Sequence, residues 1–296
     1  LMKSLKEATD EQKPELGKIA NEVKIFLEKS IDNLAEAVGF DVEKNKIVDI
    51  TLPAITPTAG HLHPLTQVTN EVVSVFNRLG FMTVEGPDIE SDYFCFQSLN
   101  IPETHPARDS HDTFFVTDHP NTVLKTHTSA MQVRTLLTHG APLRAIFPGR
   151  CFRFDATDAS HDTVFYQLEG LMVDKNISIA NLQYAMKLLL REVLKKDVKL
   201  RMRPGYFPFV EPGFELDVVC WVCNGKGCSV CKQSGWVEML PCGMVHPNIL
   251  KAANIDHTQY SGFAFGLGLT RLVMMKYGID DIRLLQSGDL RFLKQF

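Results

Sequence analysis

The segments Gly149-Arg-Cys-Phe-Arg-Phe-Asp155 and Thr163-Val-Phe-Tyr-Gln-Leu-Glu-Gly170 predict two strands joined by a polar loop over residues 156–162. Successive side chains of a strand alternate between the two faces of a sheet, so Gln167 and Glu169 share one face. The hairpin would bring Arg153 close to them. An arginine beside a carboxylate in a sheet is by default a structural ion pair, so a functional interpretation depends on the surrounding segments.

The flanking segments predict an α+β fold, an antiparallel sheet flanked by helices. Residues 64–79 carry a helical apolar stripe and lead into a strand at 81–84 before Pro87, and residues 262–271 predict a strand that runs through two glycines into a helix. Short connections between strands favour an antiparallel sheet over a doubly wound parallel one. The other predicted elements are strands at 144–147, 150–154, 164–173, 214–222 and 236–240, and helices at 129–139, 179–195 and 266–277.

Residues 1–40 predict an amphipathic helix that forms an N-terminal arm, because apolar residues recur every three or four positions after Pro14 and Gly39 follows the last of them. Its apolar stripe needs a cover, either a further helix in a coiled-coil hairpin or the chain's own globular domain. Because the sequence starts with Leu1 rather than Met, we expect residues 1–40 to be the C-terminal part of a longer arm. Residues 41–63 predict a linker, and residues 64–296 predict the globular domain.

Composition limits the class of protein. The 296 residues are 45% hydrophobic and carry a net charge of -4, so the chain can bury a large core and lacks the strong positive charge of a DNA-coating protein. No apolar run approaches the roughly 18 residues of a membrane span, and no secretory leader is recognisable. Four of the seven cysteines are clustered, a pattern more typical of a metal site in a reducing compartment than of disulfides. We therefore expect a cytoplasmic protein.

The clustered cysteines predict a metal site. Cys220 and Cys223 form one pair and Cys228 and Cys231 another, each with the two-residue spacing of a metal-binding knuckle, and four thiolates suit tetrahedral zinc. The four residues between the pairs are fewer than in common zinc ribbons. Unliganded thiols and an iron–sulfur centre therefore remain alternatives to structural zinc. The insertion at 220–231 would close the tip of a hairpin.

The order of the segments resembles a known family. A long helix leading to a strand and Pro87, the strand–loop–strand around Phe152-Arg-Phe-Asp155, and a glycine-rich strand leading into a helix with Arg271 resemble the three signature motifs of class II aminoacyl-tRNA synthetases. Finer matches, over the whole of residues 1–296, resemble the α subunits of bacterial phenylalanyl-tRNA synthetases. They are Thr126-His-Thr-Ser-Ala-Met-Gln132, Phe165-Tyr-Gln-Leu-Glu-Gly-Leu171, Tyr206-Phe-Pro-Phe-Val-Glu-Pro212, Gly243-Met-Val-His-Pro247 and Gly262-Phe-Ala-Phe-Gly266.

The resemblance implies an enzyme that uses ATP to activate phenylalanine to its adenylate and then charges tRNA(Phe). It also implies a β subunit, an (αβ)2 assembly, and contact of the arm with tRNA. The attacking carboxylate is already ionised, so arginines that neutralise phosphate charge are expected rather than a catalytic base. By resemblance, Arg153 would hold the α-phosphate region, Arg271 the distal phosphates, His161 a phosphate, and Phe165 the adenine.

The resemblance also assigns an amino-acid site. Phe207 and Phe209 would contact the substrate ring, and Ala264 would leave room at its para end. The ammonium group would be bound by Ser129, Gln167 and Glu169, and the floor of the site would be shaped by His127 and Gln132. Because ATP chemistry requires a hard cation with oxygen ligands, Glu238 is the expected Mg²⁺ carboxylate.

Three positions depart from the family pattern. Asp155 and Thr270 each stand where glutamate is common, and Pro241 stands where glycine is common. We expect these changes to be compatible with activity, because both arginines are present. The alternatives are a non-catalytic synthetase-like regulator that binds nucleic acid or protein through the cysteines, and a ligase that activates another amino acid without charging tRNA.

Overall fold

The computed structural model describes residues 13–44, 51, 60–220, 223–228 and 231–296, and the chain divides into two compact units, Leu1–Ala59 and Gly60–Phe296. Residues 1–12 of the predicted arm, and residues 45–50 and 52–59 of the predicted linker, lie outside the described residues. None of the described helices is both long and apolar enough to cross a membrane.

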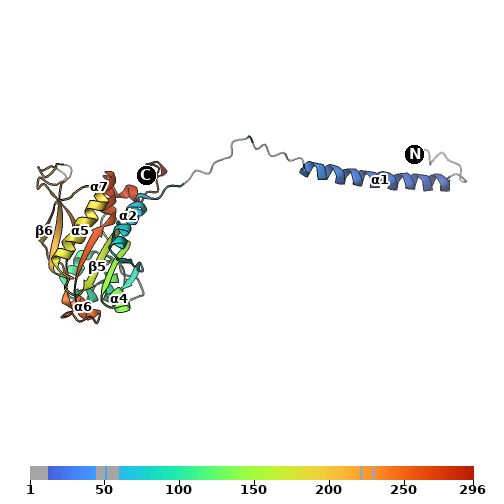
Figure 1. The fold of residues 1–296 in the computed structure, drawn as a ribbon. Helices are drawn as coiled ribbons and strands as arrows, with labels where there is room; N and C mark the ends of the chain where they lie inside the picture. Colours follow the sequence, from blue (N-terminus) through green and yellow to red (C-terminus); the bar gives the residue numbers. More distant parts are fainter. Residues whose placement is uncertain (1–12, 45–50, 52–59, 221–222, 229–230) are drawn as a thin grey trace. The chain divides into compact units, whose positions relative to one another are not determined.

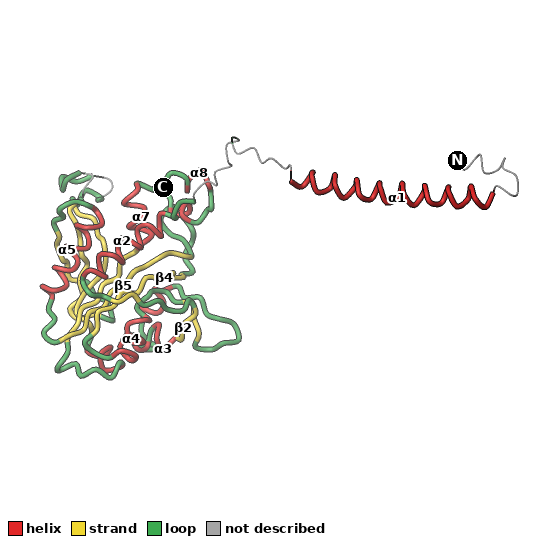
Figure 2. The backbone as a smooth tube through the Cα atoms, turned by 45° about the vertical axis from the view of Figure 1, so that its right-hand side comes forward, coloured by secondary structure: helices red, strands yellow, loops and turns green. Residues whose placement is uncertain are grey.

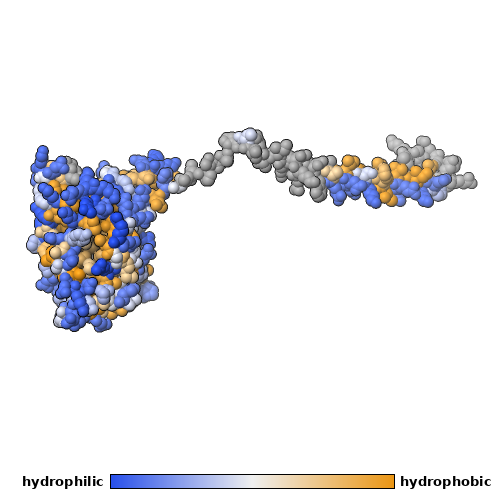
Figure 3. All heavy atoms as spheres, in the orientation of Figure 1, coloured by the Kyte–Doolittle hydropathy of each residue, from blue (hydrophilic) through white to orange (hydrophobic). Residues whose placement is uncertain are grey.

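The first unit contains one helix, α1 (Lys13–Lys44), which confirms a helical N-terminal segment. The helix runs through Gly39, which was expected to lie just past its end, and continues to Lys44, because a single glycine costs only about 1 kcal/mol in a helix and does not end it. Large apolar side chains along α1 are exposed, including Phe26 (71%) and Leu34 (63%). Figure 3 shows hydrophobic surface next to hydrophilic surface along this helix.

The second unit is built on a seven-stranded sheet with the order β1-β4-β5-β9-β8-β7-β6. All neighbouring strands are antiparallel except β1 and β4, which are parallel, so the predicted antiparallel sheet is confirmed apart from its first edge strand. The strands are β1 (Met82–Thr83), β4 (Leu143–Phe152), β5 (Val164–Asp174), β6 (Leu200–Pro204), β7 (Val210–Val219), β8 (Trp236–Val245) and β9 (Ser261–Gly268).

Helices pack on both faces of this sheet (Figure 1). One face is covered by α2 (Pro64–Arg78), α5 (Ile179–Leu194) and α7 (Leu269–Tyr277), and the other by α4 (Ala130–His139) and α6 (Pro247–Ala252). Figure 2 shows α4 beside the short helix α3 (Asp92–Cys95), on the side of the sheet away from α7. A small second sheet pairs β2 (Ile89–Ser91) with β3 (Thr122–Leu124), and the remaining short elements are the 3-10 helices η2 (Gln97–Leu99), η3 (Pro106–His111) and η4 (Ile282–Leu285), and α8 (Leu290–Leu293).

Side-chain alternation along the central strands creates two separate cores. On β9, Phe263 and Phe265 belong to the core beneath α2, α5 and α7, whereas Ala264 belongs to the core on the α4 side. On β5, Leu168 and Leu171 are divided in the same way. The two faces of the sheet therefore have different surroundings.

The core under α2 depends on a close approach between two strands. Gly170 of β5 lies opposite Phe265 of β9, and a Cβ at residue 170 would lie 2.2 Å from the Phe265 ring. The same ring stacks on Phe76 of α2 with a centroid separation of 5.2 Å. Gly170 therefore makes room for the aromatic pair that joins α2 to the sheet.

Several predicted boundaries were wrong. The predicted strands 144–147 and 150–154 form the single strand β4, because Pro148 occupies a ladder position without breaking it, and Arg153 lies one residue beyond its end. The glycines at 266 and 268 remain in β9, so the last long helix begins at Leu269 rather than 266. Strand β6 was not predicted, because its alternation of apolar residues with arginine extends over only four residues before Pro204.

Candidate active site

A cavity of about 170 Å³ opens on the α4 face of the sheet. An apolar cavity of about 150 Å³ is enough for a benzene ring, so this one can hold a single aromatic side chain. All eight residues expected to bind phenylalanine line it, together with Arg153. These eight are His127, Ser129, Gln132, Gln167, Glu169, Phe207, Phe209 and Ala264.

The apolar end of the cavity is formed by Phe207, Phe209 and Ala264. The two phenylalanines lie in the turn between β6 and β7, not on the face of a regular strand as their spacing predicted. Backbone bonding between Phe207 and Val210 closes this turn, so both rings still face the cavity. The Phe209 ring lies 6.0 Å from that of His127, measured between centroids.

The polar end of the cavity is organised around Glu169, whose side chain is almost fully buried. Burial raises the pKa of Glu169 to about 7, against the opposing effect of hydrogen bonds from Ser129 and Gln132 and of the positive charge of Arg153. Gln132 Nε2 donates to Glu169 Oε2 at 3.3 Å, while Gln132 Oε1 is buried without a partner among the described residues. A buried carboxylate beside an unpaired acceptor is suited to an ammonium ion.

Lys125 organises the segment that leads into α4, and the sequence did not single it out. Its buried Nζ donates to Pro87 O at 2.9 Å and Gly86 O at 3.2 Å, and it lies 3.3 Å from Asp88 Oδ1. Its own carbonyl accepts from Phe152 N, next to Arg153. The sequence feature that could have identified Lys125 is its place between the apolar residues of β3 and the segment 126–132, which resembles a synthetase motif.

Arg153 connects the cavity to the neighbouring surface. Its Nε donates to Thr126 O at 3.3 Å, and its Cζ lies 5.0 Å from the centroid of the Phe165 ring. The structure thus brings Phe165 beside Arg153, although Phe165 does not line the cavity. His161 is exposed and bonds to Asp158 within its own loop, so it is not brought to the cavity.

Arg271 and Glu238 lie in a second depression, of about 420 Å³, rather than in the aromatic cavity. Arg271 is exposed on α7, and the Glu238 side chain on β8 is 50% exposed. Arg203 is the cation beside Glu238, with its Nη2 3.7 Å from Glu238 Oε2. The residues predicted to bind phenylalanine, ATP and Mg²⁺ therefore divide between an aromatic cavity and a charged depression, apart from His161 and Phe165.

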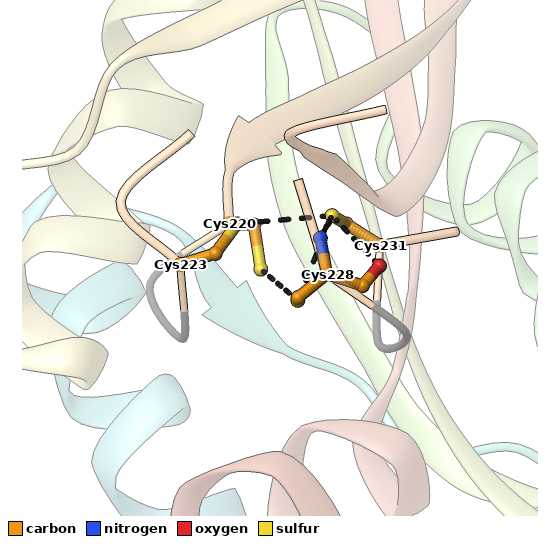
Figure 4. A group of neighbouring side chains, drawn as sticks. All are labelled: Cys220, Cys223, Cys228 and Cys231. Atoms are coloured by element: carbon orange, nitrogen blue, oxygen red, sulfur yellow. Dashed lines mark hydrogen bonds between the residues drawn. The ribbon is translucent and has the colours of Figure 1, made fainter. Parts of the chain in front are cut away.

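The four clustered cysteines converge at the tip of the β7–β8 hairpin (Figure 4), where their Sγ atoms all lie within 4.8 Å of one another. Cys220–Cys228, Cys223–Cys231 and Cys228–Cys231 have Sγ–Sγ distances of 3.8, 3.8 and 3.7 Å. A tetrahedron with metal–sulfur bonds of about 2.3 Å has edges of about 3.8 Å. Backbone N–H groups of Gly227, Cys228 and Gly235 donate to two of the sulfurs.

Comparison with known proteins places this geometry in a family. Residues 47–296 match the family described as "tRNA synthetases class II core domain (F)", and residues 1–46 match "Aminoacyl tRNA synthetase class II, N-terminal domain". The chain belongs to the class II aminoacyl-tRNA synthetases. The resemblance found in the sequence is thereby confirmed.

Curated relatives narrow the branch of the synthetases. The chain is 51% identical over 300 residues to the phenylalanine–tRNA ligase alpha subunit of Leptospira biflexa, covering 100% of this chain and 87% of that one. The alpha subunits of Desulfotalea psychrophila (48% over 300 residues, 88% of its length) and Clostridium perfringens (46% over 301 residues, 87%) match all of this chain as well. These homologues share one name, phenylalanine–tRNA ligase alpha subunit.

A solved structure supports the class II fold independently. The crystal structure of pyrrolysyl-tRNA synthetase from Desulfitobacterium hafniense aligns with a TM-score of 0.57 at 18% identity, covering 77% of this chain and 75% of the other. At this identity the likeness concerns the fold alone.

The departures from the synthetase pattern have structural surroundings that differ from one another. Thr270 is buried, and its Oγ1 accepts from Tyr166 N at 2.8 Å, so it fixes α7 to β5. Pro241 lines the aromatic cavity from β8. The structure gives no reason for Asp155, which is half-buried after β4.

The raised pKa of Glu169 predicts pH-dependent binding of phenylalanine. If Glu169 binds the substrate ammonium as expected, its protonation below about pH 7 would weaken that contact, and the Kd for phenylalanine should be about tenfold higher at pH 6 than at pH 8. Isothermal titration calorimetry across this range provides the measurement. Glu169→Gln should bind weakly at both pH values, whereas the exposed Glu103→Gln should behave like the wild type.

The stability of the same variant provides a check on folding. The pKa of Glu169 is higher in the folded state than in the unfolded state. Its contribution to the free energy of unfolding is therefore complete below the ordinary glutamate pKa, and it is lost as the pH rises through about 7. Glu169→Gln should therefore be at least as stable as the wild type at pH 8. A pH-independent Kd in the wild type would contradict the assignment.

Ala264 predicts the size limit at the apolar end. Ala264→Gly should admit para-chlorophenylalanine, changing discrimination against it by about 1–3 kcal/mol, the range for one methylene-sized group. Ala264→Val should overfill the slot and weaken phenylalanine itself. The measurement is the ratio of activation efficiencies for the two amino acids. Ala253→Gly, a buried alanine of the same core that does not line the cavity, is the control, and an equal effect there would contradict the assignment.

Proposed function

We propose that this chain is the catalytic α subunit of a phenylalanine–tRNA ligase, which activates phenylalanine with ATP and transfers it to tRNA(Phe). The observation that carries the proposal is the cavity of one-ring size, whose lining combines an apolar end at Phe207, Phe209 and Ala264 with a buried carboxylate at Glu169. Such a lining suits an amino acid with a large apolar side chain. It offers no carboxylate at the apolar end for a charged side chain.

The first step joins the amino acid to AMP. A phenylalanine carboxylate oxygen attacks the α-phosphorus of ATP, the bond from that phosphorus to the bridging oxygen breaks, and pyrophosphate leaves. Glu169, Ser129 and Gln167 would hold the ammonium, which aims the carboxylate toward Arg153. Arg153 would neutralise charge at the α-phosphate, and Phe165 beside it would stack on adenine. In the second step the terminal ribose hydroxyl of tRNA attacks the carbonyl, and AMP leaves.

The charged depression would take the rest of the nucleotide. Arg271 would bind the distal phosphates, with His161 reaching a phosphate from its exposed loop. Glu238 suits Mg²⁺, which typically takes one or two carboxylates together with substrate phosphates, and its half-exposed carboxylate faces this depression. The ion would supply charge neutralisation at the phosphates.

Partners follow from the same proposal. The name of the relatives, alpha subunit, supports a partner subunit, which we take to be a β subunit in an (αβ)2 assembly, and we take residues 1–40 to be an arm that contacts tRNA(Phe). We place residues 41–63 as its linker, residues 64–296 as the catalytic domain, and the reaction in the cytoplasm, where thiols stay reduced.

We also propose that the four cysteines bind structural zinc. The sulfur–sulfur distances of 3.7–3.8 Å match the edges of a zinc tetrahedron, and N–H donors to the sulfurs favour the thiolate form. The ion would hold together a hairpin tip that has a limited core of its own. Unliganded thiols would not require this convergence.

The two arginines provide the test of function. Arg153→Ala and Arg271→Ala should each lower phenylalanine-dependent pyrophosphate exchange by about 100-fold or more, as expected for loss of one electrostatic group. The assay should compare all twenty amino acids with the partner subunit present and absent. Arg144→Ala, on the exposed side of β4, is a matched control. Exchange with a different amino acid would favour a ligase that activates that amino acid. No exchange in the wild type would favour a non-catalytic synthetase-like regulator.

Metal analysis tests the cysteine site. Elemental analysis should find about one zinc per chain, and Cys228→Ser should lose it and lower the melting temperature. Cys242→Ser, at a buried cysteine outside the cluster, should keep the metal. Iron in place of zinc, or a folded metal-free protein with four titratable thiols, would reject the zinc assignment.

A further inference from the structure

The charged depression is built by segments far apart in the sequence. It collects residues from β6, β7, β8 and α7, and also from the end of the cysteine insertion. Its lining residues are Arg201, Arg203, Asp217, Cys231, Lys232, Ser234, Trp236, Val237, Glu238 and Arg271. The cysteine module, by which we mean the hairpin tip from Cys220 to Gly235, therefore borders the same depression as Arg271, the arginine assigned to the distal phosphates.

The floor of the depression is a fixed arrangement of charges around Asp217. This carboxylate is buried, and it accepts from Arg201 Nε at 2.8 Å and from Arg203 Nε at 2.7 Å. Arg201 also lies over the Trp236 ring, with its Cζ 4.5 Å from the centroid. Both arginine side chains are partly exposed, and their charge-assisted bonds to a buried carboxylate hold the guanidinium groups in place. The floor is therefore ordered before any ligand arrives.

Lys232 stands at the rim, held there by the backbone of the cysteine module. Lys232 and Gln233 both adopt the left-handed region, with φ of 48° and 64°. Around them, Gln233 N donates to Cys228 O at 2.9 Å and Ser234 N donates to Cys231 O at 3.0 Å. The position of Lys232 is thus set by the same turn that places Cys231 in the cluster.

The charges of the lining favour an anion. Four cationic side chains face two carboxylates, and Asp217 is already shared between two arginines. Arg203 also pairs with Glu215 and approaches Glu238 at 3.7 Å, so among the described residues Lys232 and Arg271 are the lining cations without an ion-pair partner. A lysine ammonium is a mobile point charge suited to phosphate oxygens.

We propose that Lys232 binds the distal phosphates of ATP, and the pyrophosphate formed from them, together with Arg271. The inference rests on the proposed function, because that function supplies the polyphosphate. It gives the cysteine insertion a part in substrate binding, since the module carries a ligand-binding lysine to the depression.

Binding of inorganic pyrophosphate and of a non-hydrolysable ATP analogue to the holoenzyme tests the proposal. Calorimetry should show the Kd for both ligands about tenfold higher for Lys232→Met than for the wild type, as for loss of one charge-assisted contact. Lys232→Arg should retain most of the affinity. The Kd for phenylalanine should be unchanged in both variants, because Lys232 does not line the aromatic cavity.

Lys226→Met is the matched control, since Lys226 is exposed on the other turn of the same module and does not line the depression. Equal weakening by Lys226→Met and Lys232→Met would show a diffuse charge effect and overturn the proposal, as would wild-type affinity in Lys232→Met. Elemental analysis of each variant checks that the metal content of the cysteine cluster is the same, so that loss of the module is not mistaken for loss of a contact.

Arg271→Ala separates the inference from the proposed function. If Arg271→Ala weakens pyrophosphate binding and Lys232→Met does not, the role of Lys232 is rejected and the proposed function stands. Wild-type binding in Arg271→Ala would reject the phosphate assignment of the depression itself, and with it the nucleotide part of the proposed function.

Discussion

The alternation of side chains along β5 and β9 governs the rest of the second unit. The buried apolar residues of these central strands belong either to the core under α2, α5 and α7 or to the core beside α4. A shift of one residue in their pairing would exchange the two sets, turning the Phe265 ring away from Phe76 and toward α4, and Ala264 toward the core under α2. The long antiparallel register between β5 and β9 therefore fixes the shape of the site as well as the fold.

Two buried charges give the site its rigidity and its chemistry. Hydrogen bonds from neighbouring donors partly offset the cost of burying the Glu169 carboxylate. The Lys125 ammonium is bound by the carbonyl groups of Gly86 and Pro87. Burial of an unpaired charge is unfavourable, so each group restricts the segments that bond to it. The loop before β2, the entry to α4 and the end of β4 are thereby connected through one lysine, close to Arg153.

Local patterns predicted much of this arrangement, and the failures have physical causes. The spacing of Gln167 and Glu169 placed them on one face correctly, because strand geometry is local. Phe207 and Phe209 also reached the cavity, but through a turn, which their spacing alone could not distinguish from a strand. The role of Lys125 depends on carbonyls nearly forty residues away, and the shared hollow of Arg271 and Lys232 depends on tertiary packing. Neither leaves a periodic signal in the sequence.

The contact between Gly170 and Phe265 restricts the order in which this core can change over evolutionary time. A methyl group at residue 170 would overlap the ring, whereas a smaller side chain at residue 265 would leave space beside a glycine. A lineage can therefore lose the ring first and acquire the methyl afterwards, but the reverse order passes through an overpacked intermediate. A substitution at residue 170 is therefore tolerated only after the side chain at residue 265 has become smaller.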